Sequence, residues 1–218
     1  MARTLTLLYG VLCYALFFGV FLYLVGFLAN AGVPKGIDSG ATTGLWPAVP
    51  VDLAMIALFG LQHSVMARPS FKQAWTRVVP RTVERSTYVL ATSVVLMLLF
   101  WAWQPLPQTV WRLEAPWART LAWAVFAGGF LVVLLSTFMT DHFDLFGLRQ
   151  VWTRFLDRPY RHPPFQVTLF YRLVRHPLYT GLFLAFWATP DRVPRFFPRP
   201  GKAHPRVESG DEAPSGMR

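Results

Sequence analysis

The sequence is poor in charged residues and nearly free of cysteine. Only 15% of its 218 residues are charged, whereas 54% are hydrophobic, a balance that excludes an ordinary water-soluble domain and indicates a membrane protein. The one cysteine, Cys13, lies inside an apolar run, which excludes an intrachain disulfide and a cysteine-based metal site. We interpret Cys13 as a small core residue, and the sequence predicts no metal site.

Acidic residues are also scarce, with 11 Asp and Glu against 21 Lys and Arg, for a net charge of +10. In a soluble protein this excess would suggest a nucleic-acid partner. Here the basic residues lie between apolar runs, where membrane topology accounts for them. We therefore expect a protein surrounded by membrane lipid, with no nucleic-acid partner.

Long hydrophobic runs are what the sequence does have. A transmembrane helix needs roughly 20 mostly apolar residues, and four segments approach or meet this length: 4–29, 51–66, 86–103 and 120–140. A fifth apolar run, 178–188, follows Pro177 and is too short to cross alone, so it must pack against protein or lie at the interface. The predicted fold class is all-α, a polytopic transmembrane bundle with four full spans plus this short fifth helix.

Two of the connections are strongly basic, and the other two are not. Because cytoplasmic loops of membrane proteins are enriched in Lys and Arg, the basic links after the second and fourth spans should be cytoplasmic, together with the N-terminus. Residues 1–190 are predicted to form one membrane domain. The Pro-, Arg- and Gly-rich stretch 191–218 has no apolar periodicity and is predicted to be a disordered tail.

Two histidines near the cytoplasmic ends of spans are candidates for chemistry. His63 lies in Gln62-His63-Ser64, and His142 follows the fourth span. Ionisable groups at membrane depth often serve a function, but His63 could equally be hydrogen-bonded to a neighbouring helix, and His142 could be a solvated interfacial residue. Both could also ligate one haem iron, which would make the protein an electron carrier.

The segment before the fifth apolar run is the most informative. Pro177 fits the first turn of a helix, which places Arg175 and His176 at the N-terminus, where backbone N–H groups and an arginine fork favour a carboxylate. Gly181 would permit a close approach of backbone or cofactor. The alternative is an ordinary interfacial helix start with topological charges.

The motif formed by Arg175, His176, Pro177, Tyr179 and Gly181 resembles the signature of membrane methyltransferases similar to isoprenylcysteine carboxyl methyltransferase. The segments 62–69, 83–88, 142–148 and 173–190 together resemble the bacterial methanethiol S-methyltransferases of the nurim family. The likeness covers most of residues 1–190.

This resemblance implies transfer of a methyl group from S-adenosyl-L-methionine to a small thiol, methanethiol, which yields dimethyl sulfide at the bacterial inner membrane. It implies a cytoplasmic cofactor site to which Arg175, His176, Pro177, Tyr179 and Gly181 contribute. His63 or His142 is a hypothetical base for the thiol. The rival interpretation is a non-catalytic membrane protein similar to nurim, with polar clusters that serve only packing.

The sequence departs from the family after residue 190. Relatives continue with another apolar helix and a Glu-rich cytoplasmic segment that contributes to the cofactor site, and neither pattern is found in 191–218. We expect the cofactor site to be incomplete and activity to suffer. Calorimetric titration should then show weaker S-adenosyl-L-methionine binding than in a relative with both segments, and ordinary affinity would contradict this.

Overall fold

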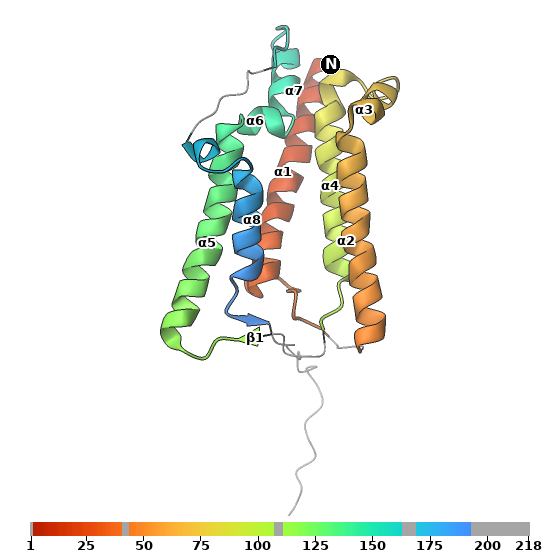
Figure 1. The fold of residues 1–218 in the computed structure, drawn as a ribbon. Helices are drawn as coiled ribbons and strands as arrows, with labels where there is room; N and C mark the ends of the chain where they lie inside the picture. Colours follow the sequence, from red (N-terminus) through yellow and green to blue (C-terminus); the bar gives the residue numbers. More distant parts are fainter. Residues whose placement is uncertain (1, 41–43, 107–110, 163–168, 193–218) are drawn as a thin grey trace, which may run out of the picture.

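The computed structural model describes residues 2–40, 44–106, 111–162 and 169–192. Most of the described residues are helical, and only two short strands accompany the helices (Figure 1). The elements are α1 (Ala2–Ala29), α2 (Leu45–Ala67), α3 (Pro69–Trp75), α4 (Arg81–Ala102), β1 (Trp111–Arg112), α5 (Pro116–Met139), α6 (His142–Leu145), α7 (Leu148–Phe155), a 3-10 turn (Leu169–Arg172), α8 (Pro177–Trp187) and β2 (Asp191–Arg192). The predicted all-α class is confirmed.

Four helices, α1, α2, α4 and α5, are long and apolar enough to cross a membrane, and α8 is a shorter apolar helix. They correspond to the four predicted spans and the fifth apolar run. The largest difference is at α2, which begins at Leu45 and contains Pro50, whereas the predicted span began at residue 51. Pro50 is the sixth residue of α2, just beyond the four N–H groups that lack helical partners, so its missing N–H removes one hydrogen bond near the start of the helix.

Local sequence sets where several helices begin and end. Pro69, Pro116 and Pro177 each occupy the first turn of a helix, in α3, α5 and α8. This position suits proline, whose missing N–H would have no helical partner. Asn30 follows the end of α1 in the left-handed conformation (φ 53°), a role that asparagine tolerates better than most residues.

The bundle has two sides joined through α1. Helix α4 packs against both α1 and α2, and α8 packs against α5. In Figure 1, α5 and α8 form one side and α2 and α4 the other, with α1 between them. An aromatic core that includes Phe27, Phe100, Phe126 and Phe130 joins the two sides.

Helix α8 is held along α5 by two glycines that face each other. A side chain added at Gly181 would place Cβ 2.6 Å from the Gly129 carbonyl oxygen, and one at Gly129 would lie 2.7 Å from the Gly181 carbonyl. Ala185, one turn further along α8, is fully buried against the same contact. The short fifth helix therefore packs against protein, one of the two arrangements expected for it.

The end of α8 is tied to the link between α4 and α5. Strands β1 and β2 pair in antiparallel register at the end of the bundle opposite the N-terminus (Figure 1). Asp191 accepts two hydrogen bonds from Arg119, at 2.7 and 2.8 Å. Asp191 and Arg192 thus belong to the folded unit, although the disordered tail was predicted to begin at residue 191. Residues 193–218 lie outside the described part, so their disorder stays a prediction.

Three short helices, α3, α6 and α7, lie at the end of the bundle that carries the N-terminus (Figure 1). The sequence analysis did not predict them. They are 7, 4 and 8 residues long, too short for hydropathy to distinguish from a basic loop. Of these helices, α7 packs against α1 and α4, α6 packs against α5 and α7, and α3 packs against α2.

Candidate active site

A cavity of about 500 Å³ lies between the two sides of the bundle, toward the end that carries α6 and α7. Its volume falls within the usual range of small-molecule sites, roughly 300–1,000 Å³. Most of its wall is aromatic or aliphatic. The polar side chains on the wall are those of His63, Arg85, Tyr88, Thr92, Thr140, Tyr171, His176 and Tyr179. An apolar cavity with a few convergent polar groups is the usual form of a binding site.

Arg85 supplies the permanent charge of this cavity. Its Nε donates a 2.7 Å hydrogen bond to the Leu145 carbonyl, and its guanidinium lies 5.4 Å from the ring centre of Tyr88. Among the described residues, no carboxylate lies within ion-pair distance of Arg85. The two terminal amino groups therefore remain available to an anionic ligand group.

Gly147 fixes the loop that holds Arg85. This glycine has φ 89°, and a Cβ here would lie 2.8 Å from the backbone nitrogen of the fully buried Ser86. Only glycine allows both this conformation and this approach. The contact seats α6 directly on the first turns of α4, which aligns the Leu145 carbonyl with Arg85.

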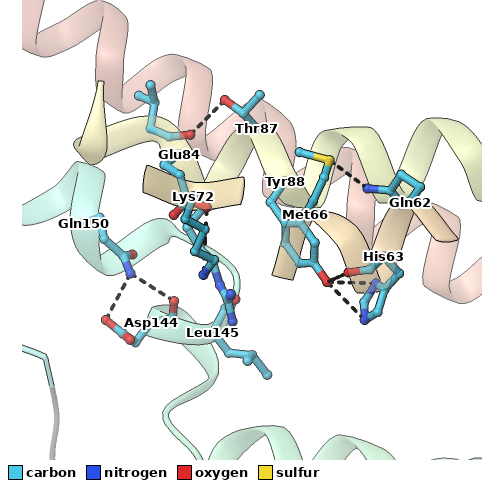
Figure 2. Close-up of polar contacts among 12 residues, drawn as sticks. Gln62, His63, Met66, Lys72, Glu84, Thr87, Tyr88, Asp144, Leu145 and Gln150 are labelled. Carbon is cyan, nitrogen blue, oxygen red and sulfur yellow. Dashed lines mark hydrogen bonds and ion pairs between the residues drawn. The ribbon is translucent and has the colours of Figure 1, made fainter. Parts of the chain in front are cut away.

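His63 and Tyr88 form a polar pair on the same wall (Figure 2). The Tyr88 hydroxyl lies 2.9 Å from Nδ1 and 3.1 Å from Nε2 of His63, and 3.3 Å from its carbonyl oxygen. A single hydroxyl hydrogen can serve only one of these acceptors at a time. Tyr88 can therefore release the ring nitrogen by donating to the carbonyl, which leaves the imidazole able to accept a proton.

The first turn of α8 forms the opposite wall. Pro177 starts this helix as predicted, and His176 is its N-cap residue without a side-chain capping bond. His176 and Tyr179 line the cavity. Burial raises the pKa of Tyr171, another wall residue, so its hydroxyl stays protonated near neutral pH.

The other members of the predicted cofactor set lie away from the cavity wall. Arg175 is exposed just before α8, and Pro177 is buried in its first turn. Gly181 faces α5, so its lack of a side chain serves helix packing. The structure therefore brings His63, His176 and Tyr179 together and places Arg175 beside them at the helix start.

His142 occupies a different position, buried among α1, α5 and α6. Its Nδ1 lies 2.8 Å from the Thr137 hydroxyl, and its Nε2 lies 2.7 Å from the Tyr14 hydroxyl. Thr137 donates its own hydrogen to the Leu134 carbonyl at 2.6 Å, so it accepts from Nδ1–H. Tyr14 then donates to Nε2 of a neutral ring. Both nitrogens are engaged, which suits a packing role better than that of a base or a haem ligand.

Because the buried His142 ring is neutral, we expect the protein to lose stability at acidic pH. Burial lowers the pKa of His142, opposed by the nearby Asp141 carboxylate. Because the folded pKa lies below the ordinary value of about 6.5, the stability this ring contributes is complete above that pH and declines as pH falls below it. Thermal unfolding in detergent should show a falling Tm between about pH 7.5 and about pH 5.5.

The variant His142→Gln should have a lower Tm at the higher pH and a flatter dependence on pH. His162→Gln, which changes an exposed histidine, is the matched control and should keep the slope of the unmodified protein. Equal slopes for all three proteins would contradict a neutral buried ring.

Two wall residues, Arg85 and Tyr88, were not singled out from the sequence. Their spacing of three residues near the start of α4 places them on one helix face. That spacing was a usable signal, but Arg85 was counted among the basic residues that set topology. The sequence alone does not show that Arg85 and Tyr88 line a cavity, because the opposite wall is formed by α8, which is distant in the chain.

Comparison with known proteins now places the chain. Residues 53–190, more than half of it, match the family described as NnrU protein. The chain belongs to the NnrU protein family. A methanethiol S-methyltransferase from a Pseudomonas species is 50% identical over 186 residues, which cover 85% of this chain and 71% of the relative.

Other relatives of this NnrU-family chain agree. The methanethiol S-methyltransferase of Crocosphaera subtropica is 47% identical over 190 residues, 87% of this chain and 74% of its own length. Nurim from Xenopus laevis is 28% identical over 202 residues, 83% of this chain and 70% of its own length. No solved structure matches. The resemblance predicted from the motifs is confirmed, as is the class of enzyme, a methyltransferase of a multi-pass membrane family.

Proposed function

We propose that this chain transfers a methyl group from S-adenosyl-L-methionine to methanethiol or a similar small thiol, forming dimethyl sulfide in the case of methanethiol. The observation that supports this most directly is the cavity in which His63, Arg85, His176 and Tyr179 meet. An apolar pocket with one fixed cation and two histidines suits a small apolar thiol that must lose its proton.

The residues around the cavity fit the methyl donor. Aromatic faces such as those of Tyr88 and Tyr179 attract a sulfonium cation. The uncapped N-terminus of α8, which Arg175 precedes, offers N–H groups and positive charge to a carboxylate. When bound, S-adenosyl-L-methionine supplies an electrophilic methyl group on its sulfonium sulfur.

His63 and Arg85 would activate the acceptor. The reactive form of a thiol is the thiolate, so a group must take the S–H proton. His63 can accept it on a ring nitrogen once Tyr88 donates to the His63 carbonyl. The guanidinium of Arg85 would stabilise the resulting sulfur anion, which would take the methyl group as the bond between the methyl carbon and the sulfonium sulfur breaks, leaving S-adenosylhomocysteine.

The setting of the cavity favours this reaction. A thiolate and a sulfonium lose their opposite charges as they approach the transition state, and water opposes this loss because it stabilises the separated ions. Apolar walls exclude water. The remaining task of the protein is to hold the two sulfur atoms and the methyl carbon in line, a positioning effect that can be large.

We also propose that the site faces the cytoplasm from the inner membrane. The end of the bundle with the cavity carries the basic residues of α3, α7 and the start of α4, including Lys72, Arg81 and Arg154. Positive residues concentrate on the cytoplasmic side of such membranes. A cysteine-labelling experiment with an impermeant reagent should modify a cysteine placed at Gln73 only after the membrane is opened.

The test of function is labelled methyl transfer by purified protein in lipid. The unmodified chain should convert methanethiol and methyl-labelled S-adenosyl-L-methionine to labelled dimethyl sulfide. His63→Ala should slow turnover by about a hundredfold, in the range typical of a general base. Ser64→Ala, which changes the neighbouring exposed residue, is the control and should be active.

No turnover by the unmodified chain, with methanethiol and other small thiols alike, would overturn the proposal and favour a non-catalytic protein similar to nurim. The haem alternative would require a Soret absorbance band in the purified protein. The geometry already disfavours it, because His63 lines the cavity whereas both ring nitrogens of His142 have protein partners.

A further inference from the structure

A second cavity, of about 570 Å³, lies beside the first at the basic end of the bundle, and Arg85 lines both. Five cationic side chains and two carboxylates face this second cavity: Lys72, Arg81, Arg85, Arg154, Arg158, Glu84 and Asp144. These charges come from α3, α4 and the α7 region. Membrane topology explains why basic residues are found at this end of the bundle, but it does not explain why they converge on one cavity.

Three of these cations have no ion-pair or hydrogen-bond partner for their side chains in the part of the chain that the structure describes. Arg81, Arg154 and Arg158 are exposed, and none of them makes an ion pair within the described residues. The two carboxylates are already engaged. Glu84 lies 3.9 Å from Lys72, and Asp144 accepts a 2.8 Å hydrogen bond from the Tyr160 hydroxyl. The three arginines therefore leave an uncompensated positive field in a concave site.

The engagement of Asp144 is firm. Burial and, after it, the hydrogen bond to Asp144 raise the pKa of Tyr160 to about 12, so this hydroxyl remains a donor at any physiological pH. Gln150 adds a second donor to the same carboxylate at 3.2 Å. Asp144 is thus satisfied by neutral donors on the cavity wall, and no ion pair joins it to Arg81, Arg154 or Arg158.

The two short helices beside these arginines, α7 and α3, have the character of interfacial elements. Trp152 and Phe155 stack at 5.8 Å on α7, and Phe71 and Trp75 stack at 5.8 Å on α3. Trp152 is 51% exposed, on a different face of α7 from the cavity-lining Gln150 and Arg154. Exposed aromatics beside basic residues on short amphipathic helices are typical of segments at lipid headgroup level.

We propose that this basic cavity binds the phosphate group of an anionic phospholipid from the adjacent leaflet. Basic pockets between helices at this side of a membrane are suited to such headgroups, and the unpaired arginines offer bidentate hydrogen bonds to phosphate oxygens. A bound lipid would neutralise the excess charge and link α4 to α7. This inference does not depend on the proposed methyl transfer.

The test uses purified protein in neutral detergent, with bound lipid counted by native mass spectrometry and stability measured as Tm. Dioleoylphosphatidylglycerol should bind and raise the Tm, and dioleoylphosphatidylcholine should do neither. The double variant R154Q/R158Q should bind phosphatidylglycerol about twenty-fivefold more weakly, from about fivefold for each surface arginine. Its Tm in phosphatidylcholine should be unchanged, because neither arginine has a protein partner.

R77Q is the matched control, since it removes an exposed arginine of the same basic end that does not line the cavity. R77Q should bind phosphatidylglycerol like the unmodified protein. Equal binding of both lipids, or equal losses in R77Q and the double variant, would overturn the proposal. Displacement of phosphatidylglycerol by millimolar inorganic phosphate would overturn the lipid assignment and identify a soluble phosphate compound as the ligand.

Discussion

Replacing Arg85 with methionine should reduce methyl transfer by about a hundredfold or more, while the protein still folds. Removal of a single preorganised electrostatic contact in an enclosed site typically has an effect of this size. Methionine preserves much of the side-chain volume, so the loss would come from charge and hydrogen bonding. Steady-state kinetics with methanethiol would measure the effect on turnover, and a separate titration with S-adenosyl-L-methionine would measure the effect on cofactor binding.

The lysine variant separates charge from geometry. Arg85→Lys keeps the positive charge but cannot reproduce both the bond to the Leu145 carbonyl and the free fork, so it should recover only part of the activity. Arg77→Gln removes an equal charge from the same end of the bundle and should retain activity. If Arg85→Met turned over like Arg77→Gln, the assignment of Arg85 to the site would be wrong.

Adding a methyl group at Gly129 or Gly181 should destabilise the protein by about 1–3 kcal/mol each, the usual cost of overpacking a close contact. The added Cβ would lie within 2.7 Å of a backbone oxygen in either case, and backbone on a packed helix cannot move aside as a flexible side chain can. Separation of α8 from α5 would also displace His176 and Tyr179. Thermal unfolding and methyl transfer should both register the change.

Gly128 provides the matched control. It neighbours Gly129 on α5, but a Cβ built there meets nothing within 4 Å. Gly128→Ala should therefore be neutral or slightly stabilising, since alanine favours the helix by about 1 kcal/mol. A loss of stability in Gly128→Ala equal to that in Gly129→Ala would contradict the prediction, because the loss would then not depend on the contact between α5 and α8.

The spans were predictable because hydropathy is averaged over a whole helix. The 28 residues of α1 and the 24 of α5 leave little ambiguity. Pro177 marked the start of α8 correctly, because proline has a definite place in a first turn. The start of α2 was missed because Pro47 and Pro50 resemble helix breakers when read without their neighbours.

The site was only partly predictable, because it depends on contacts between distant segments. His63, His176 and Tyr179 were identified from motifs and do meet at the cavity. Gly181 was expected near a cofactor, but no local pattern reveals its partner on α5. Arg85 was hidden among basic residues with a sufficient topological explanation. Only the position of the Leu145 carbonyl distinguishes it from them.

The partner of Arg85 has a consequence for the choice of acceptor. A carbonyl oxygen orients the guanidinium without cancelling its charge, whereas a carboxylate would have neutralised it. An amine-bearing thiol such as cysteamine would bring an ammonium group into this positive field and should be a poor acceptor. Neutral alkyl thiols and hydrogen sulfide carry no such group. The charge of Arg85 would therefore make the site select neutral sulfur compounds over cationic ones.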